Sequence, residues 1–161
     1  MENSEVLFAA RVLDGRSGHE VGRELLAQLF FEKTGEPLPS IRIAEGGKPH
    51  FEGSRLYFSI SHTKHHAFCA LAEEPVGIDA EEMDRKIDLR LAEKILSPAE
   101  KVRFDGATDQ RMALLRLWVL KEASVKLTGE GLRGYPNHTD FSPDDPRIRE
   151  TDGCVVAILT E

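Results

Sequence analysis

The sequence is poor in cysteine, in long apolar runs and in net positive charge, and each shortage argues against a class of protein. The two cysteines, Cys69 and Cys154, lie in apolar stretches without a CxxC spacing, so we expect buried free thiols rather than metal or redox work. No apolar run reaches the roughly 18 residues of a membrane span, and Met1–Glu5 lacks the basic start of a signal peptide. A net charge of −7 disfavours a general nucleic-acid binder, and we expect a cytoplasmic protein with no membrane partner.

What the sequence does contain is typical of an ordinary globular chain with an uneven distribution of charge. Its 161 residues are 40% hydrophobic and 30% charged, which suits one domain or two small lobes that share a core. Residues 42–66 carry four Lys or Arg and four His against two acids, whereas residues 73–84 carry six acids and no base. Such segregation would allow an anion to bind on one side and a divalent cation on the other.

Hydrophobic periodicity predicts strands and helices in both halves of the chain, without low-complexity tracts or short-period repeats. Ser97, Pro98 and Glu100 predict a capping box at a helix start. The connector 73–75 is the predicted lobe boundary, because each half runs from strand to helix and closes on an apolar strand. The predicted strands are 5–13, 41–43, 56–61, 67–72, 76–81 and 154–159, with a hairpin between the third and fourth, and the predicted helices are 19–33, 89–96, one from 98 and one from about 109 to 127.

The last of these helices has apolar side chains on nearly every side, which is typical of a buried helix. Glu122 and Lys126 are exceptions that lie one turn apart on one face. A carboxylate in apolar surroundings needs a cation, and Lys126 or a metal would serve. On these residues alone, a structural ion pair between positions i and i+4 is the favoured explanation.

Asp79 and Glu81 lie two residues apart on a predicted strand, so their side chains leave the same face. Adjacent carboxylates repel each other unless solvent, a proton or a cation lies between them. Together with Glu122 they would offer oxygen ligands without His or Cys, the set that Mg²⁺ prefers when a phosphorylated substrate completes its coordination. Solvated acidic pairs are common at strand ends, so the Asp-x-Glu pattern alone is a weak signal.

The basic segment offers candidate groups for an anion. Lys48 and Pro49 follow a Gly-Gly turn, and Ser61 and His62 end a predicted strand, from which His62 could donate to a phosphate oxygen. A plain surface turn and a half-buried imidazole are the alternatives, and His65 and His66 are expected to be solvated loop residues.

Five motifs occur in order along the chain: Gly47-Lys48-Pro49, Phe58-Ser59-Ile60-Ser61-His62, Val76-Gly77-Ile78-Asp79-x-Glu81, Leu96-Ser97-Pro98-x-Glu100 and Trp118-x-x-Lys121-Glu122-Ala123-x-x-Lys126. Together they resemble the 4′-phosphopantetheinyl transferases, and among these the Sfp type that activates surfactin synthetase. The resemblance covers residues from about 19 to 132.

The resemblance implies transfer of the phosphopantetheine arm of coenzyme A to a serine of an acyl or peptidyl carrier protein, with release of 3′,5′-ADP. By position in the motifs, Asp79, Glu81 and Glu122 would hold Mg²⁺, and Glu122 would also take the serine proton. Lys126 would neutralise or protonate the leaving phosphate. The substrate-binding residues would be Lys48 and Pro49 beside the adenine nucleotide, and Ser61 and His62 at its phosphates.

The fold implied by the resemblance is an α+β pseudo-dimer of two similar lobes with the active site between them, usually as a monomer. Residues 1–75 would form the nucleotide-side lobe, and residues 76–161 the metal-binding and catalytic lobe. Relatives generally carry an early basic helix that grips the 3′-phosphate, and here strand 5–13 leads almost directly to helix 19–33. That helix would be replaced by one of the basic residues Arg11, Arg16, His19 or Arg23.

Two alternatives to the transferase stay open, the first suggested by this departure and the second by the metal ligands. One is a non-catalytic module that binds coenzyme A or a carrier protein, which would not need both metal ligands and a base. The other is a Mg²⁺-dependent phosphohydrolase, which would need a residue to position the attacking water, and the sequence offers none that we can identify.

Overall fold

The computed structural model describes residues 5–43, 45, 47–129 and 139–161, and in this part of the chain helices and strands are mixed. The predicted α+β class is confirmed. In chain order the elements are β1 (Leu7–Val12), α1 (Gly18–Thr34), β2 (Ile41–Ile43), β3 (Pro49–Phe51), β4 (Tyr57–His62), β5 (His66–Ala72), β6 (Val76–Glu82), the 3₁₀ helix η1 (Leu89–Leu91), α2 (Ala92–Ile95), α3 (Pro98–Asp105), α4 (Gln110–Thr128), β7 (Ile148–Thr151) and β8 (Cys154–Thr160).

The first half of the chain forms an antiparallel sheet with the order β1-β5-β4, and α1 covers one of its faces. Because successive strand residues point to opposite faces, Ala67, Cys69 and Leu71 of β5 pack with the buried side of α1. Ser17 caps α1 by accepting a hydrogen bond from the backbone N–H of Glu20. The strands β2 and β3 form a separate two-stranded ribbon beside this layer.

The second half repeats this arrangement with the sheet order β6-β8-β7 and the helix α4. Val155, Ala157 and Leu159 of β8 pack against α4. The short elements α2 and α3 close the other side of α4 through a small cluster that includes Phe104 and Leu114. The capping box predicted at Ser97 and Glu100 is present at the start of α3.

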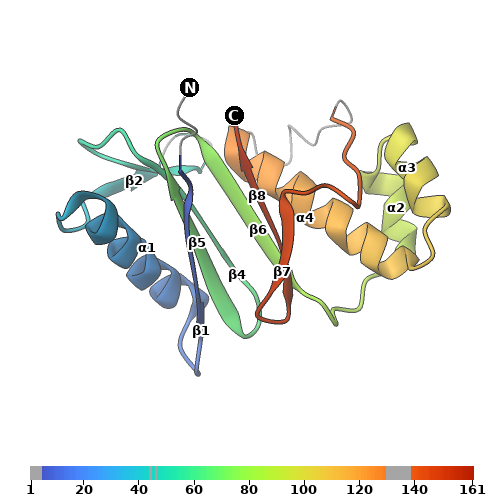
Figure 1. Cartoon of the computed structure of the whole chain (residues 1–161), viewed down its shortest axis with the longest axis horizontal. Helices are drawn as coiled ribbons and strands as arrows, with labels where there is room; N and C mark the ends of the chain where they lie inside the picture. The colour runs from blue at the N-terminus through green and yellow to red at the C-terminus, as the bar shows by residue number, and fades with distance from the viewer. Residues whose placement is uncertain (1–4, 44, 46, 130–138) are drawn as a thin grey trace.

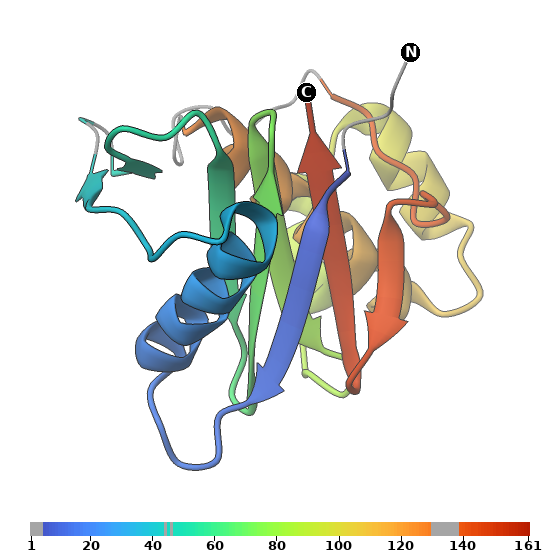
Figure 2. The same cartoon turned by 60° about the vertical axis from the view of Figure 1, so that its left-hand side comes forward.

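The two sheets pack face to face, so the molecule has the layer order helix, sheet, sheet, helix. Figure 1 shows both sheets between α1 and α4, and Figure 2 shows α4 behind the strands and α1 on the opposite side. The shared core is built from the alternate strand residues that face away from the helices, namely Phe68, Ala70, Ala72, Val76, Ile78, Ala80, Cys154, Val156 and Ile158.

Most predicted elements are found within one or two residues of their predicted ends. One predicted helix differs, and two short strands were not predicted. The predicted helix 89–96 is broken into η1 and α2, because Asp88 caps the tight first turn and the chain turns again at Leu96. Residues 49–51, for which no strand was predicted, pair with β2. The segment 148–151 forms the edge strand β7, which was not predicted. Gly46, the first glycine of the Gly-Gly turn, and Gly131, where we expect the last helix to have ended, lie outside the described residues.

Strand membership supports a division of the chain near Pro75, which we keep as a proposal. Residues 73–75 connect β5 of the first sheet to β6 of the second. Within the described residues, no helix is long and apolar enough to cross a membrane.

Candidate active site

The candidate site begins where β6 lies directly against α4. Asp79 and Glu81 share the face of β6 that points to this helix, together with Gly77. A Cβ atom added to Gly77 would lie 2.1 Å from the carbonyl oxygen of Ala123. The missing side chain therefore allows β6 to approach the helix turn that carries Glu122 and Lys126.

Asp79 is a buried carboxylate with incomplete hydrogen bonding. Its side chain is in contact with Nζ of Lys126 and with Oγ of Ser61, each 3.4 Å from Oδ1. Its Oδ2 atom is buried and has no hydrogen-bond partner among the described residues. An orphaned carboxylate oxygen is costly in a protein interior unless a proton or a cation compensates it.

The surroundings favour the neutral form of Asp79. Burial raises the pKa of Asp79 to about 7; the positive charge of Lys126 opposes this shift, and the negative charges of Glu81 and Glu122 add to it. Both neighbouring carboxylates are thus close enough to repel charge on Asp79. A divalent cation placed among them would remove this repulsion.

The three predicted metal ligands gather on one side of β6 and α4 without converging on a single point. In the described part of the chain, their oxygen atoms do not form a group lying wholly within 4.8 Å. Glu81 is instead paired with Arg85, four residues further along the chain, and Asp79 is paired with Lys126. Glu122 is half-buried on α4. The orphaned Oδ2 and the all-oxygen donor set fit a hard cation such as Mg²⁺.

Lys126 joins the acidic group to the first half of the molecule. Besides Asp79, its Nζ donates to the carbonyl oxygen of Ile60 at 3.3 Å, in β4. It also lines a cavity of about 400 Å³ between the start of α1, the strand β4 and the end of α4. The polar lining residues are His19, Arg23, Lys48, Ser59, His62 and Lys126.

Lys48, Pro49 and His62 all line this cavity, as a substrate-binding role requires. Lys48 donates from Nζ to the carbonyl oxygen of Leu127 at 2.6 Å, at the carboxyl end of α4, and burial lowers its pKa. His62 is exposed and packs over Gly18, where an added Cβ would lie 2.2 Å from Cγ of the imidazole. The start of α1 thus leaves room for the histidine beside the cavity.

Ser61 is placed differently from the other three. Its side chain is buried, it does not line the cavity, and its Oγ accepts a hydrogen bond from the backbone N–H of Ala80 at 3.2 Å. Ser59 does the same for Ile78 at 3.1 Å. These two hydroxyl groups bridge β4 and β6, and no local sequence pattern indicates this pairing between distant strands.

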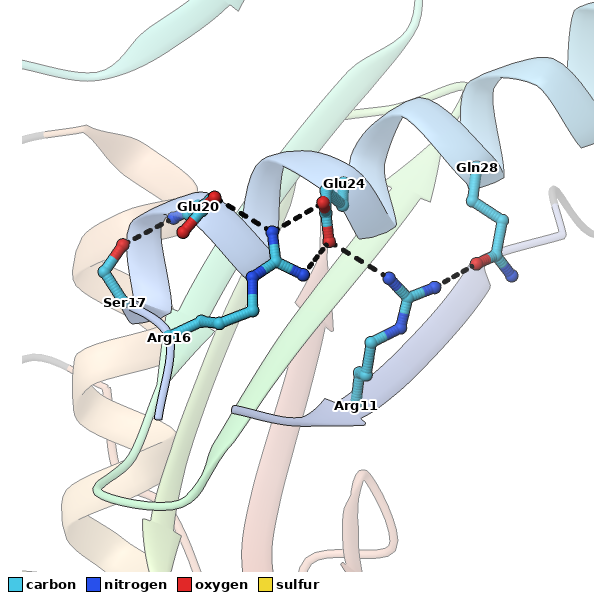
Figure 3. A network of polar contacts seen from close by, with 6 residues as sticks. All are labelled: Arg11, Arg16, Ser17, Glu20, Glu24 and Gln28. Atoms are coloured by element: carbon cyan, nitrogen blue, oxygen red, sulfur yellow. Dashed lines mark hydrogen bonds and ion pairs between the residues drawn. The ribbon is translucent and has the colours of Figure 1, made fainter. Parts of the chain in front are cut away.

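Of the four basic side chains that the sequence offers near α1, two are paired with other residues. Arg16 is paired with Glu20 and Glu24, and Arg11 with Glu24 and Gln28, in the network of Figure 3. The other two, His19 and Arg23, line the cavity. The structure therefore distinguishes the cations that face the candidate site from those that stabilise the outer side of α1.

A buried ion pair supports the motif helix and has no signal in the local sequence. Nζ of Lys121 lies 2.7 Å from Oε1 of Glu100, and both side chains are fully buried. Glu100 also accepts hydrogen bonds from the backbone N–H groups of Ser97 and Phe141. The residue next to Glu122 in the sequence thus ties α4 to α3 and to the segment after residue 138.

A comparison with protein families identifies the group to which this fold and these motifs correspond. The family model described as the 4′-phosphopantetheinyl transferase superfamily matches residues 75–153. The chain belongs to this superfamily. The resemblance predicted from the motifs is confirmed, and the matched segment includes Asp79, Glu81, Glu122 and Lys126.

Curated relatives in the 4′-phosphopantetheinyl transferase superfamily match larger parts of the chain. It is 34% identical to the 4′-phosphopantetheinyl transferase psf-1 of Bacillus pumilus over 71% of this chain and 46% of psf-1. It is 33% identical to gsp of Aneurinibacillus migulanus over 55% of this chain and 37% of gsp. With HetI of Nostoc sp. the identity is 31%, over 91% of this chain and 65% of HetI. The matches thus span from about a third to about two thirds of these relatives.

Proposed function

We propose that the protein transfers the 4′-phosphopantetheine moiety of coenzyme A to a serine of an acyl or peptidyl carrier protein, in a reaction that depends on Mg²⁺. The products would be the holo-carrier protein and 3′,5′-ADP. The observation that carries the proposal is the position of Lys126, which both contacts the buried Asp79 and lines the cationic cavity. A phosphoryl group bound there would lie between carboxylates that suit a metal and cations that suit a leaving phosphate.

In this proposal Asp79, Glu81 and Glu122 would hold the metal. The buried Oδ2 of Asp79 and the mutual repulsion of the three carboxylates support this assignment. When bound, Mg²⁺ would neutralise charge on the pyrophosphate of coenzyme A.

The chain's own groups would carry the proton and the leaving group. The serine oxygen of the carrier protein attacks the phosphorus atom that bears the pantetheine arm, and Glu122 accepts the serine proton, directly or through water. A new P–O bond to serine forms as the bond to the bridging pyrophosphate oxygen breaks. Lys126 neutralises or protonates the departing phosphate of 3′,5′-ADP.

The cavity would take the nucleotide part of coenzyme A. Lys48, Pro49 and His62 line it, as do His19 and Arg23, which we propose in place of the early basic helix. Arg11 and Arg16 are neutralised by their acidic partners and are left out of this role. Ser61, with its hydroxyl group on Asp79 and Ala80, would hold the metal ligand in place rather than touch a phosphate.

The alternative is a module that binds coenzyme A or a carrier protein without catalysis. One feature of the first half favours this alternative: residues 13–17 form a turn where relatives generally carry a basic helix for the 3′-phosphate. In the transferase proposal the protein acts in the cytoplasm as a monomer. Gel filtration of the purified chain tests the oligomeric state.

Mass spectrometry of apo carrier proteins tests the transfer. The carriers would be incubated with the protein, coenzyme A and Mg²⁺, beside the variants Glu122→Gln and Glu36→Gln. We expect one phosphopantetheine arm to be added by the wild type and by Glu36→Gln, whose side chain is exposed on a loop after α1. Loss of the base in Glu122→Gln should slow transfer by about 10²- to 10⁴-fold.

Two other outcomes would decide against the proposal. If no carrier gains mass while calorimetry still detects binding of coenzyme A, the non-catalytic module is the better reading. If Glu122→Gln transfers at the wild-type rate, Glu122 is not the base.

A further inference from the structure

Three side chains that can bind metals meet at the end of the interface between the two sheets. His66 is the first residue of β5, Glu82 the last of β6 and Cys154 the first of β8. One ligand atom from each lies within 4.8 Å of the others. Glu82 and Cys154 face each other directly in the register of β6 and β8. This cluster unites residues from both halves of the chain.

The cluster is separate from the acidic group of the candidate active site. Glu82 follows Glu81 in β6, and adjacent strand residues point to opposite faces. Glu81 therefore belongs to the face toward α4, whereas Glu82 belongs to the face that packs on the first sheet. The cluster also differs in chemistry, because it combines an imidazole, a carboxylate and a thiol.

The carboxylate of Glu82 is held in a fixed orientation by the hairpin between β4 and β5. Its Oε1 accepts hydrogen bonds from Oγ1 of Thr63 at 2.8 Å and from the backbone N–H of His65 at 3.2 Å. Its Oε2 lies 3.5 Å from Sγ of Cys154. Outer hydrogen bonds of this kind orient the ligands in metal sites.

The imidazole of His66 supplies an independent indication of a ligand. Its Nδ1 atom is buried and has no hydrogen-bond partner among the described residues. The nearest carboxylate oxygen, Oε1 of Glu82, is 3.9 Å away, which is too long for a hydrogen bond. His66 was predicted to be a solvated loop residue, and the prediction is wrong because pairing in β5 draws its ring into the interface.

We propose that His66, Glu82 and Cys154 form a site for a transition-metal cation, with Zn²⁺ as the best match. Imidazole and thiolate are ligands that Zn²⁺ accepts and Mg²⁺ avoids. Ligands about 2.0 to 2.3 Å from a tetrahedral ion are separated by roughly 3.3 to 3.8 Å. The distances from Glu82 Oε2 to Cys154 Sγ, 3.5 Å, and from Glu82 Oε1 to His66 Nδ1, 3.9 Å, come close to that spacing. A water molecule would take the fourth position.

The charges at this site balance only when the thiol releases its proton. Burial raises the pKa of Cys154 to about 12, and the charge of Glu82 adds to the shift, so the metal-free cluster holds a neutral thiol. Binding of Zn²⁺ breaks the S–H bond, forms a Zn–S bond and releases one proton to solvent. One thiolate and one carboxylate then neutralise the two positive charges of the ion. The site would cross-link the halves of the molecule, and its stabilising free energy would rise with the logarithm of the ion concentration.

Co²⁺ spectroscopy on the full chain tests the proposal without reference to transferase activity. The protein would be stripped with EDTA, supplied with excess Mg²⁺ to occupy oxygen-only sites, and titrated with Co²⁺. We expect a thiolate-to-cobalt charge-transfer band that saturates at one equivalent and is bleached by Zn²⁺. The band should be lost in Cys154→Ser and kept in Cys69→Ser, since Cys69 is equally buried but lies against α1.

A second variant and a second measurement guard against misfolding of Cys154→Ser. His66→Asn should retain the far-UV circular dichroism of the wild type and lose the band or bind Co²⁺ at least tenfold more weakly. Zn²⁺ should raise the melting temperature of the wild type and of Cys69→Ser, and raise that of His66→Asn by less or not at all. Absence of the band in the wild type, or its persistence in a folded Cys154→Ser, overturns the proposal and leaves a hydrogen-bonded contact between the halves.

Discussion

At the scale of single residues, Asp79 shows how burial and charge act on one group. Its pKa of about 7 lies above the ordinary value of 3.8, so the folded chain holds a proton that the unfolded chain releases. The resulting stabilisation is fully present below pH 3.8 and is lost as the pH rises through about 7. At 1.36 kcal/mol per unit, the loss is on the order of a few kcal/mol.

We therefore predict that Asp79→Asn removes part of the pH dependence of stability. Asparagine is neutral at every pH and has nearly the same shape, so in EDTA the variant should lose less stability than the wild type between pH 4 and 7. Thermal melts across this range measure the difference. The exposed Asp84→Asn is the matched control and should follow the wild type. Equal slopes for Asp79→Asn and the wild type would contradict the assigned pKa.

At the scale of elements, the sequence predicts a strand or helix correctly where a local pattern of residues determines it. The alternation of residues 76–81 predicts β6, and Ser97 with Glu100 predicts the start of α3. The edge strand β7 is polar and escapes a search for apolar runs. Asp152 and Gly153, with φ values of 55° and 70°, form the turn before β8, and Asp-Gly was the signal that could have revealed this hairpin.

Of the candidate site, only the residue pairs that lie within one sequence motif were predictable. The spacing of Asp79 with Glu81, and of Glu122 with Lys126, places each pair on one face of its element. The contacts of Ser61 with Asp79 and of Lys121 with Glu100 join distant segments, and no local period encodes them. The same holds for the cluster of His66, Glu82 and Cys154, which exists only because three strands end together.

The close approach of β6 to α4 gives a prediction for Gly77→Ala. The new methyl group would collide with the backbone of Ala123 and Leu127 and push the helix away from the strand. Overpacking of this kind costs about 1 to 3 kcal/mol, and transfer should slow further because Glu122 and Lys126 move relative to Asp79. Urea denaturation and the carrier-protein assay measure the two effects.

Gly106→Ala is the matched control for this change. At Gly106 an added Cβ would meet its nearest atom at 3.6 Å, an ordinary contact, and the backbone has no positive φ. Its stability and activity should stay close to those of the wild type. If Gly77→Ala behaves like Gly106→Ala, the strand and helix are not held together as tightly as the structure indicates.

At the scale of the whole molecule, the two halves share a buried core and hydrogen bonds, so we do not expect them to behave as independent domains. Apolar side chains of both sheets form one shared cluster, and the hydroxyl groups of Ser59 and Ser61 satisfy backbone N–H groups of β6 in place of a strand partner. Because each half completes the other, we expect both to unfold in one cooperative step.

Ser59→Ala tests this coupling, since it removes a contact made by the first half and leaves the buried N–H of Ile78 in the second without its partner. We expect a loss of about 1 to 3 kcal/mol in the free energy of unfolding. The fluorescence of Trp118, which lies in the second half, should shift together with far-UV circular dichroism to the same lower urea midpoint. The exposed Ser40→Ala should leave that midpoint unchanged. A fluorescence transition that stays at the wild-type midpoint while circular dichroism becomes biphasic would mean that the halves fold separately and that the site between them assembles only afterwards.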